Sequence, residues 1–422
     1  MGTAERCWLN RQTHAIIAGM HETTAKASTI SLTAHILQDP LNPFPWYRIM
    51  RENHPIYYSS EFHSWFVSRY GDVQSVIDDT ATFSSEKSIW SRPGADPSKS
   101  TKTLLWTDPP RHRQLRTLIN QAFTPRTIAN LAPRISQIVH SHLDAIEAQG
   151  SLDIIKDLAN PLPIIVIAEL LGIPSQDQAQ FKQWSDIIVG TARKQKKQAV
   201  IDMNGYFLTI VTQRRQQPQD DLISALLNAH IEGTYLTDAE ILSFCRLLLV
   251  AGHETSTNLI GNALLTLDEH PETLAEVQRQ PELIPGAIEE VIRYRTPIQR
   301  LRRAATVDIE MRGQLIKAGE IVSPILASAN RDAEQFDAPE IFDIHRTPNR
   351  HSGFGHGIHY CIGSSLARLE TRLALEALLT RFSNLKRVPN IPIEHVASSF
   401  VYGVKSLPMT FSSVVSMDTM SP

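Results

Sequence analysis

The sequence predicts a mainly α-helical protein with a minor β region, built as a single domain over residues 31–412. Three observations lead to this fold class. Apolar residues recur at roughly helical spacing through most of residues 109–270 and again after Gly363. Short strand-like runs follow residue 297. No shift in composition divides the 422 residues, although a chain of this length has room for more than one average domain.

Both ends of the chain lack the pattern of a packed element. Residues 1–30 are polar, and their apolar patch AIIAGM is too short for the core of a signal peptide. We expect a polar extension there and a Ser- and Met-rich tail over residues 413–422. The longest apolar stretches fall short of the ~20 residues that span a bilayer. Together with three widely spaced cysteines, this favours a soluble, cytoplasmic protein without a membrane span.

The domain is expected to open with a helix, two strands and a second helix from Asn42 onward. The Pro-, Gly- and Ser-rich run at residues 92–100 predicts a long loop of the kind that often covers a binding site. Helices follow over residues 109–270, interrupted by the polar connection RRQQPQDD. Strands after residue 297, with a turn at MRGQ, complete the pattern.

A helix of more than ~25 residues is predicted to begin at Thr237. Thr237 and Glu240 have the spacing of a capping box, in which each side chain binds the backbone N–H of the other. The helix contains Gly252, which costs about 1 kcal/mol relative to alanine and therefore indicates that another group approaches the backbone there. On a later helix, Glu290 and Arg293 are three residues apart and can form an ion pair.

The segment FGHGIHYCIG presents Cys361 just before a helix whose leucines recur at roughly helical spacing. Gly355, Gly357 and Gly363 allow dihedral angles closed to other residues and the close approach of a flat cofactor. The helix N-terminus favours a thiolate. Cys361 is therefore a candidate metal ligand, although a lone buried cysteine is usually just a small apolar side chain.

At this loop the sequence resembles the cytochrome P-450 family in its soluble, mostly bacterial branch. The family's haem-binding frame is matched by Phe354, Gly355, Gly357, His359, Cys361 and Gly363. The resemblance runs from about Pro45 to Phe411 and implies the cytochrome P-450 fold, with haem b between the long oxygen-binding helix and the cysteine-loop helix. It further implies that the Cys361 thiolate is the axial iron ligand, pushing electron density toward the iron to favour O–O cleavage.

Within the long helix, Ala251, Gly252, Glu254 and Thr255 match the family's oxygen-binding motif. The resemblance implies that Thr255 hydrogen-bonds the bound dioxygen and that Glu254 relays protons. Taken alone, Thr255 would be expected to bond back to the carbonyl four residues earlier, and Glu254 to be a solvated or paired side chain. A zinc-protease HExxH interpretation fails, because Thr257 stands where the second histidine is required.

The resemblance makes Glu290 and Arg293 the family's ExxR pair, joined by Arg346 to brace the segment before the cysteine loop. If that pair is buried, removal of one partner costs ~3–5 kcal/mol. Haem also carries two propionates, which need cationic or donor partners when buried. The candidates at family positions are His112, Arg116, Arg303 and His359, with Arg302 as the alternative to Arg303.

The substrate pocket implied by the resemblance is largely apolar and favours a small hydrophobic molecule. Its candidate residues are Trp90, Leu105, Leu247, Val250, Ile298, Gln299, Leu301, Phe400 and Val401. Gln299 and Arg300 would orient a polar or anionic group if they face inward, whereas Arg300 could equally point to solvent.

The predicted function is a haem-thiolate monooxygenase that activates dioxygen and hydroxylates or epoxidises such a molecule, in secondary metabolism or catabolism. No GxGxxG unit stands in a βαβ setting, so electrons are expected from a ferredoxin or flavodoxin with its NAD(P)H reductase. Arg111, Arg113 and Arg372 are candidate contacts for such a partner, or simply solvated helix faces. The formal charge of −3 gives no reason to expect nucleic-acid binding.

Three alternatives remain open on the sequence alone. A peroxide-driven or isomerising haem enzyme would need no redox partner, although the intact Glu254–Thr255 pair argues against it. A haem-based sensor would bind a ligand without turnover. A structural zinc protein would use His351, His356, His359 and Cys361, whose spacing matches no familiar zinc site.

Overall fold

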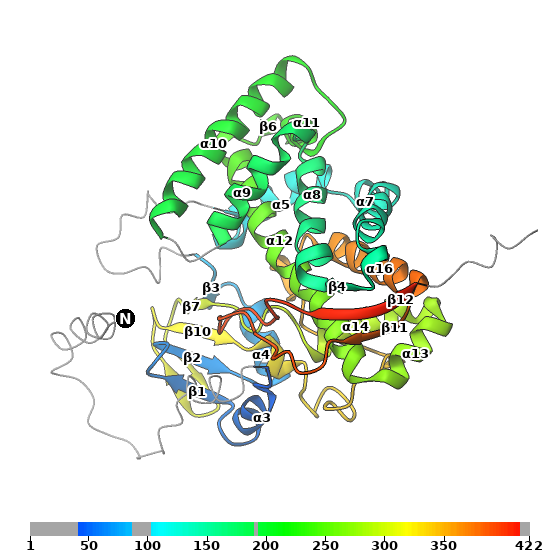
Figure 1. The fold of residues 1–422 in the computed structure, drawn as a ribbon. Coiled ribbons are helices and arrows are strands. Elements are labelled where there is room, and N and C mark those ends of the chain that lie inside the picture. Colours follow the sequence, from blue (N-terminus) through cyan, green and yellow to red (C-terminus); the bar gives the residue numbers. More distant parts are fainter. Residues whose placement is uncertain (1–40, 87–102, 190–192, 414–422) are drawn as a thin grey trace, which may run out of the picture.

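The computed structural model describes residues 41–86, 103–189 and 193–413, and Figure 1 shows helices over most of the molecule with a sheet to one side. The predicted class, mainly α with a minor β region, is confirmed. The predicted extension at 1–30, the loop at 92–100 and residues 414–422 of the predicted tail lie outside the described residues.

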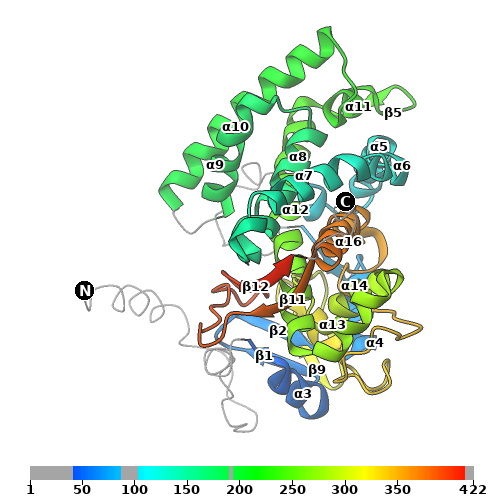
Figure 2. The same ribbon diagram turned by 45° about the vertical axis from the view of Figure 1, so that its right-hand side comes forward.

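The long helix predicted from Thr237 is α12 (Asp238–Glu269), with 32 residues. Its capping box is present: the Thr237 side chain accepts from the backbone N–H of Glu240, and the Glu240 side chain accepts from that of Thr237. Most of its middle and C-terminal part is buried, because helices pack around it on several sides (Figures 1 and 2). These neighbours are α8 (Pro161–Leu170), α9 (Gln178–Val189), α10 (Arg193–Gln216), α14 (Ile284–Tyr294) and α16 (Ser364–Arg381).

The remaining helices cover this centre or the sheet. They are α3 (Phe44–Asn53), α4 (Tyr70–Asp78), α5 (Arg111–Ala122), α6 (Pro125–Ala129), α7 (Ala132–Asp144), α11 (Leu222–Asn228), α13 (Pro271–Arg279) and α15 (Leu326–Ala329). The helical part is less continuous than predicted, since a π-helical turn (Ile154–Ala159) leads directly into α8, where Pro161 begins the new helix.

The main sheet has five strands in the order β1-β2-β10-β7-β3. These are β1 (Ile56–Ser59), β2 (Ser64–Val67), β10 (Ile321–Pro324), β7 (Arg303–Ala305) and β3 (Phe83–Ser84). Strand β10 runs parallel to β2 and antiparallel to β7, so the sheet joins the N-terminal strands to those predicted after residue 297. Its apolar face packs on α4 through a second, smaller core that contains Val73, Val76 and Val322.

Short strands form the other pairings. A three-stranded sheet has the order β11 (Phe382–Arg387), β12 (Pro408–Ser413) and β4 (Ser151–Asp153), and two hairpins join β5 (His230–Ile231) to β6 (Thr234–Tyr235) and β8 (Ile309–Met311) to β9 (Gln314–Ile316). The last hairpin turns at Arg312 and Gly313, within the predicted MRGQ turn. In the described part of the chain, no helix has both the length and the apolar character needed to cross a bilayer.

Candidate functional site

Cys361 lies immediately before α16, in the turn that follows a short 3-10 helix (Gly357–His359). Burial raises the pKa of its thiol, while backbone N–H groups of Gly363 and Ser364 and the charges of Arg116 and Arg368 oppose that shift. Burial outweighs these donors, so the loop alone does not hold a thiolate. A coordinating metal ion deprotonates a thiol outright, and the donors already aimed at the sulfur would then stabilise the anion.

The backbone of the cysteine loop explains two of its three glycines. Gly355 and Gly357 have φ angles of 72° and 62°, which disfavour any side chain. A Cβ at Gly357 would also lie 2.7 Å from Oδ1 of Asp78. At Gly363 the prediction of an unusual dihedral is wrong, because its φ is −83°, a value open to all residues. The backbone N–H of Cys361 donates to the carbonyl of Phe354 (2.9 Å) and closes the loop.

Three nitrogen-bearing side chains converge near the loop from elements far apart in the sequence. His112 comes from α5, Arg303 from β7 and His359 from the cysteine loop, and the two histidine rings lie 4.2 Å apart between centroids. Both ring nitrogens of His112 and the Nε of Arg303 are buried and have no hydrogen-bond partner in the described part of the chain. Buried donors of this kind need an acceptor, so they indicate an anionic ligand at this place.

The charges around these donors point to the same conclusion. Burial, with the nearby charge of Arg116, lowers the pKa of His112 to about 4, and burial with the charge of Arg303 lowers that of His359 to about 3. Burial also lowers the pKa of Arg303, to about 10. Burial is the largest cause of each shift, and for the two histidines nearby arginine charges add to it. The two carboxylates of haem fit this donor set, and Cys361 fits its iron.

The structure favours Arg303 over Arg302, the two arginines that the sequence left open. Arg303 is 3% exposed and its charge acts on His112 and His359, whereas Arg302 is half-buried and its charge acts on Arg300. Strand β7 pairs with β10 on one edge and with β3 on the other, and this pairing fixes the orientation of the strand. Because adjacent side chains of a strand point to opposite faces, the orientation determines which of them faces the interior.

The predicted oxygen motif lies in the middle of α12. The hydroxyl of Thr255 donates to the carbonyl of Ala251 (2.5 Å), which is the back-bond expected of an isolated helical threonine. Burial raises the pKa of Glu254, and the charge of Lys196 partly opposes the shift. A Cβ at Gly252 would lie 2.9 Å from Cδ1 of Ile167, so the group that approaches this glycine is a side chain of α8.

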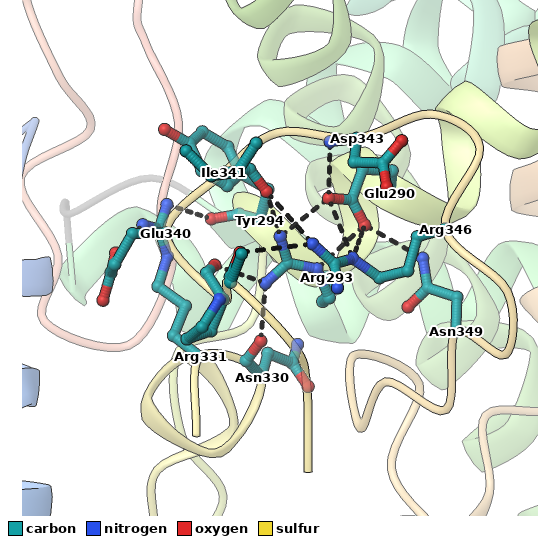
Figure 3. A network of polar contacts seen from close by, with 12 residues as sticks. Glu290, Arg293, Tyr294, Asn330, Arg331, Glu340, Ile341, Asp343, Arg346 and Asn349 are labelled. Carbon is teal, nitrogen blue, oxygen red and sulfur yellow. Dashed lines mark hydrogen bonds and ion pairs between the residues drawn. The ribbon is translucent and has the colours of Figure 1, made fainter. Parts of the chain in front are cut away.

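Glu290 and Arg293 form a fully buried, bidentate ion pair on α14 (Figure 3). Nε and Nη2 of Arg293 donate to the two carboxylate oxygens of Glu290 at 2.8 and 2.7 Å, and both side chains are 0% exposed. Arg346 approaches the same carboxylate at 3.3 Å, and Asn349 donates to it at 3.1 Å. The carboxylate therefore has partners at each oxygen.

The same network ties α14 to the segment before the cysteine loop. Arg293 donates to the carbonyls of Asn330, Pro339 and Ile341 at 2.7–2.9 Å, as Figure 3 shows in part. Asn330 in turn accepts from the backbone N–H of Ser352 (2.7 Å), two residues before Phe354. The pair therefore fixes the position of the chain segment that precedes the cysteine loop.

The candidate pocket residues are only partly brought together by the described structure. Ile298 and Val401 form an isolated β-bridge, and the backbone N–H of Gln299 donates to the carbonyl of Phe400. The side chain of Gln299 is buried and faces α3, where it accepts from the Tyr47 hydroxyl (3.0 Å) and donates to a backbone carbonyl. The Gln299 amide therefore has two partners within the protein, and its role toward a substrate stays a prediction.

The other pocket candidates differ in exposure. Leu105, Val250 and Phe400 are exposed, and Leu247 and Leu301 are partly buried. Val250 lies on α12 next to Ala251, and Ala251 is one turn before Thr255. Trp90 lies outside the described residues.

Sequence analysis missed Glu370, a carboxyl group on the buried face of α16. It is 1% exposed, and its oxygens form no well-formed hydrogen bond with any described residue. Burial raises its pKa from 4.5 to about 8, and the Ser256 hydroxyl of α12 slightly opposes this shift. The sequence contained an indication that Glu370 is buried, because Glu370 lies four residues after Leu366 on the apolar stripe of its helix.

The protonation of Glu370 predicts a pH-dependent stability. In the unfolded chain it ionises near pH 4.5, whereas in the folded protein it keeps its proton up to about pH 8. The free energy of unfolding therefore falls as pH rises between these values. Glu370→Gln should match the parent near pH 5 and unfold at a temperature higher by about 5 °C or more at pH 8. Thermal unfolding across this range checks it, with Glu376→Gln on the same helix as control; a constant difference would contradict it.

The zinc alternative finds no support in the described residues. Their His, Cys, Asp and Glu side chains form no cluster of three that could hold a metal ion. His351 contacts Glu289, His356 contacts Asp78 and His359 contacts Ser85, so the proposed ligands face different partners.

Comparison with known proteins supplies independent evidence. The family model Cytochrome P450 matches residues 163–406. Putative cytochrome P450 YjiB of Bacillus subtilis is 41% identical over 87% of this chain and 94% of its own length. Cyclomarin C epoxidase CymV of Salinispora arenicola is 40% identical over 87% and 95%. The crystal structure of CYP109E1 from Bacillus megaterium with testosterone has 42% identity and a TM-score of 0.82, covering 87% of this chain and 99% of its own.

Proposed function

Since this chain belongs to the cytochrome P450 family and is a haem-thiolate monooxygenase, we propose that it hydroxylates or epoxidises a hydrophobic organic molecule with electrons from a separate redox protein. The observation that carries the proposal is that Cys361 lies two residues after His359, whose ring lies 4.2 Å from that of His112, where nitrogens of His112 and Arg303 have no partner among the described residues. The relatives are consistent with such substrates: one is named an epoxidase, and one structure contains testosterone.

Bound haem supplies the redox-active iron that activates dioxygen and transfers one of its atoms. The chain's own residues would hold and tune that group. Cys361 would provide the thiolate, Arg303 and Arg116 would neutralise the carboxylates, and the two neutral histidines would donate hydrogen bonds to them. The charge and burial of these residues support the roles.

Proton delivery is assigned to the middle of α12. Burial raises the pKa of Glu254 toward neutrality, which suits a group that takes up and releases protons at working pH. The Thr255 hydroxyl donates to Ala251 in the described structure and can rotate to donate elsewhere. We propose that this pair passes protons from the protein surface to the reacting oxygen.

Electron supply is proposed to come from a ferredoxin or flavodoxin with its NAD(P)H reductase. Of the three candidate contacts, Arg111 is paired with Glu240 and Arg372 with Glu376, as expected of solvated helix faces. Arg113, on the first turn of α5, is exposed. It is the best remaining candidate for contact with an acidic partner.

The proposed reaction is tested by supplying a surrogate ferredoxin, its reductase, NADPH and ¹⁸O₂ to the purified haem protein with a panel of hydrophobic compounds. We expect products that carry a single labelled oxygen. Product formed only when hydrogen peroxide replaces the redox proteins would support a peroxide-driven enzyme instead. Binding without any product from the panel would support a sensor.

Thr255→Ala should separate electron consumption from product formation. Loss of the hydroxyl removes a proton donor at the reacting site, so product per NADPH consumed is expected to fall by about tenfold or more while hydrogen peroxide accumulates. Thr257→Ala is the matched control, since Thr257 makes the same back-bond, to His253 (2.9 Å), two residues further along α12. Equal coupling in the two variants would remove Thr255 from the proton path.

A further inference from the structure

Arg300 is a buried cation that has no anionic partner among the described residues. It is 8% exposed, and its guanidinium donates to the carbonyl and the hydroxyl of Ser399 (3.3 and 3.1 Å) and, at 3.4 Å, to the hydroxyl of Ser323. Its remaining neighbours include the rings of Phe62 and Phe66, with centroids 4.7 and 5.4 Å away. In the described chain it forms no ion pair with a carboxylate.

This arrangement differs from that of the other deeply buried arginines outside the predicted haem site. Arg51, Arg293, Arg295 and Arg331 are each within ion-pair distance of a glutamate, and Arg214 contacts Asp221. Burial and the charge of Arg302 lower the pKa of Arg300 to about 10, so it still carries its charge at neutral pH. A buried charge without a counter-ion is costly, and it is normally retained where an anion binds.

Ser399, whose hydroxyl accepts from Arg300, is part of the lining of a small hollow beside this cation. Ser398 also lines it, and its hydroxyl oxygen accepts from the backbone N–H groups of Phe400 and Val401. The hydroxyl oxygen of Ser399 accepts from Arg300. The protons of both serine hydroxyls are therefore directed away from these donors and can point to a ligand.

The hollow adjoins the two segments to which the substrate pocket was assigned. Val401 lines it, and Val401 pairs with Ile298 in the β-bridge. Phe400 is 42% exposed at the same loop. A ligand whose polar end is held at Ser398 and Ser399 would thus lie beside the apolar side chains of Val396 and Val401, within a lining that also contains polar side chains.

We propose that Arg300, with the hydroxyls of Ser398 and Ser399, binds the carboxylate of a hydrophobic carboxylic acid that is the substrate of this enzyme. The inference rests on the proposed function and narrows its substrate class. The guanidinium provides the charge, because arginine binds a carboxylate through paired N–H donors. The apolar chain of the acid would extend past Val401. A carbon of that chain, and not the carboxylate end, would then be the part that is oxidised.

The test uses the haem-loaded protein with saturated fatty acids of 10 to 18 carbons and their methyl esters as probes. Dissociation constants are measured by calorimetry and by the shift of the haem Soret band. We expect the acid to bind about tenfold or more tightly than its ester, since a charge-assisted hydrogen bond is lost on esterification. Arg300→Gln should remove that preference, and Arg300→Lys should retain part of it.

Arg312→Gln is the matched control, because Arg312 is an exposed arginine paired with Asp72 on the surface. It should keep the parent's preference for the acid. The haem spectrum and unfolding temperature of Arg300→Gln show whether the variant is folded.

Several results would overturn the proposal. Equal affinity for acid and ester, no binding of any acid, or an unchanged preference in Arg300→Gln would each exclude this carboxylate site. Calorimetric binding that depends on Arg300 but neither shifts the Soret band nor leads to oxidised acid would assign the site to an effector and reject the substrate role. Failure of the proposed monooxygenase function is distinguishable, because a neutral substrate would then also yield no labelled product.

Discussion

Replacement of Cys361 by alanine is expected to abolish the haem-thiolate spectrum and all monooxygenase activity. Cys361 lies in the cysteine loop just before α16, and the one other cysteine among the described residues, Cys245, is buried on α12. Serine at the same position would also fail, since its hydroxyl does not ionise as a thiol does. The measurements are the absorption spectrum after reduction under carbon monoxide and product formation with the surrogate redox proteins.

Cys245→Ala provides the control for this experiment. Cys245 is fully buried on α12, and burial raises the pKa of its thiol to about 12, so it is expected to remain a neutral, apolar side chain. The variant should keep the parent's spectrum and activity, with a modest loss of stability. A thiolate spectrum that survives in Cys361→Ala and disappears in Cys245→Ala would overturn the assignment of the iron ligand.

Glu290→Gln is expected to prevent the accumulation of folded haem protein. The change removes one charge from a fully buried pair and leaves Arg293 and Arg346 facing a neutral amide. Breaking a buried pair in this way costs about 3–5 kcal/mol, a large part of the 5–15 kcal/mol by which a typical domain is stable. Haem content per protein and the unfolding midpoint measure the effect.

Glu276→Gln makes the same chemical change at the surface. Glu276 contacts the exposed His345, so its loss should alter the free energy of unfolding by less than about 0.5 kcal/mol. If Glu290→Gln instead retained the parent's haem content and midpoint, the network of Figure 3 would not brace the cysteine loop.

Local spacing explains which parts of the fold and site were predictable. The capping box at Thr237 involves residues three apart, and the pair of Glu290 and Arg293 has the same spacing on α14. Such contacts depend on helix geometry alone. The turn geometry at Gly355 and Gly357 is equally local, since a positive φ needs glycine wherever the chain adopts it.

The partners across the molecule were not predictable in the same way. Gln299 and Arg300 are adjacent in the sequence, yet their side chains have different partners. The amide of Gln299 accepts from the Tyr47 hydroxyl, whereas the guanidinium of Arg300 lies against the ring of Phe62. Tyr47 is 252 residues away from Gln299 along the chain. No periodicity within the segment carries that information.

The sequence by itself determined the mainly α class, the long helix with its cap and the cysteine loop, because each depends on residues close together in the chain. Only the tertiary structure decided that Arg303 rather than Arg302 lies near His112 and His359, that Glu370 is buried as an acid, and that Arg300 has no counter-ion among the described residues. Those outcomes depend on which face of each element is covered and on what covers it. That information arises when segments distant in the sequence pack together.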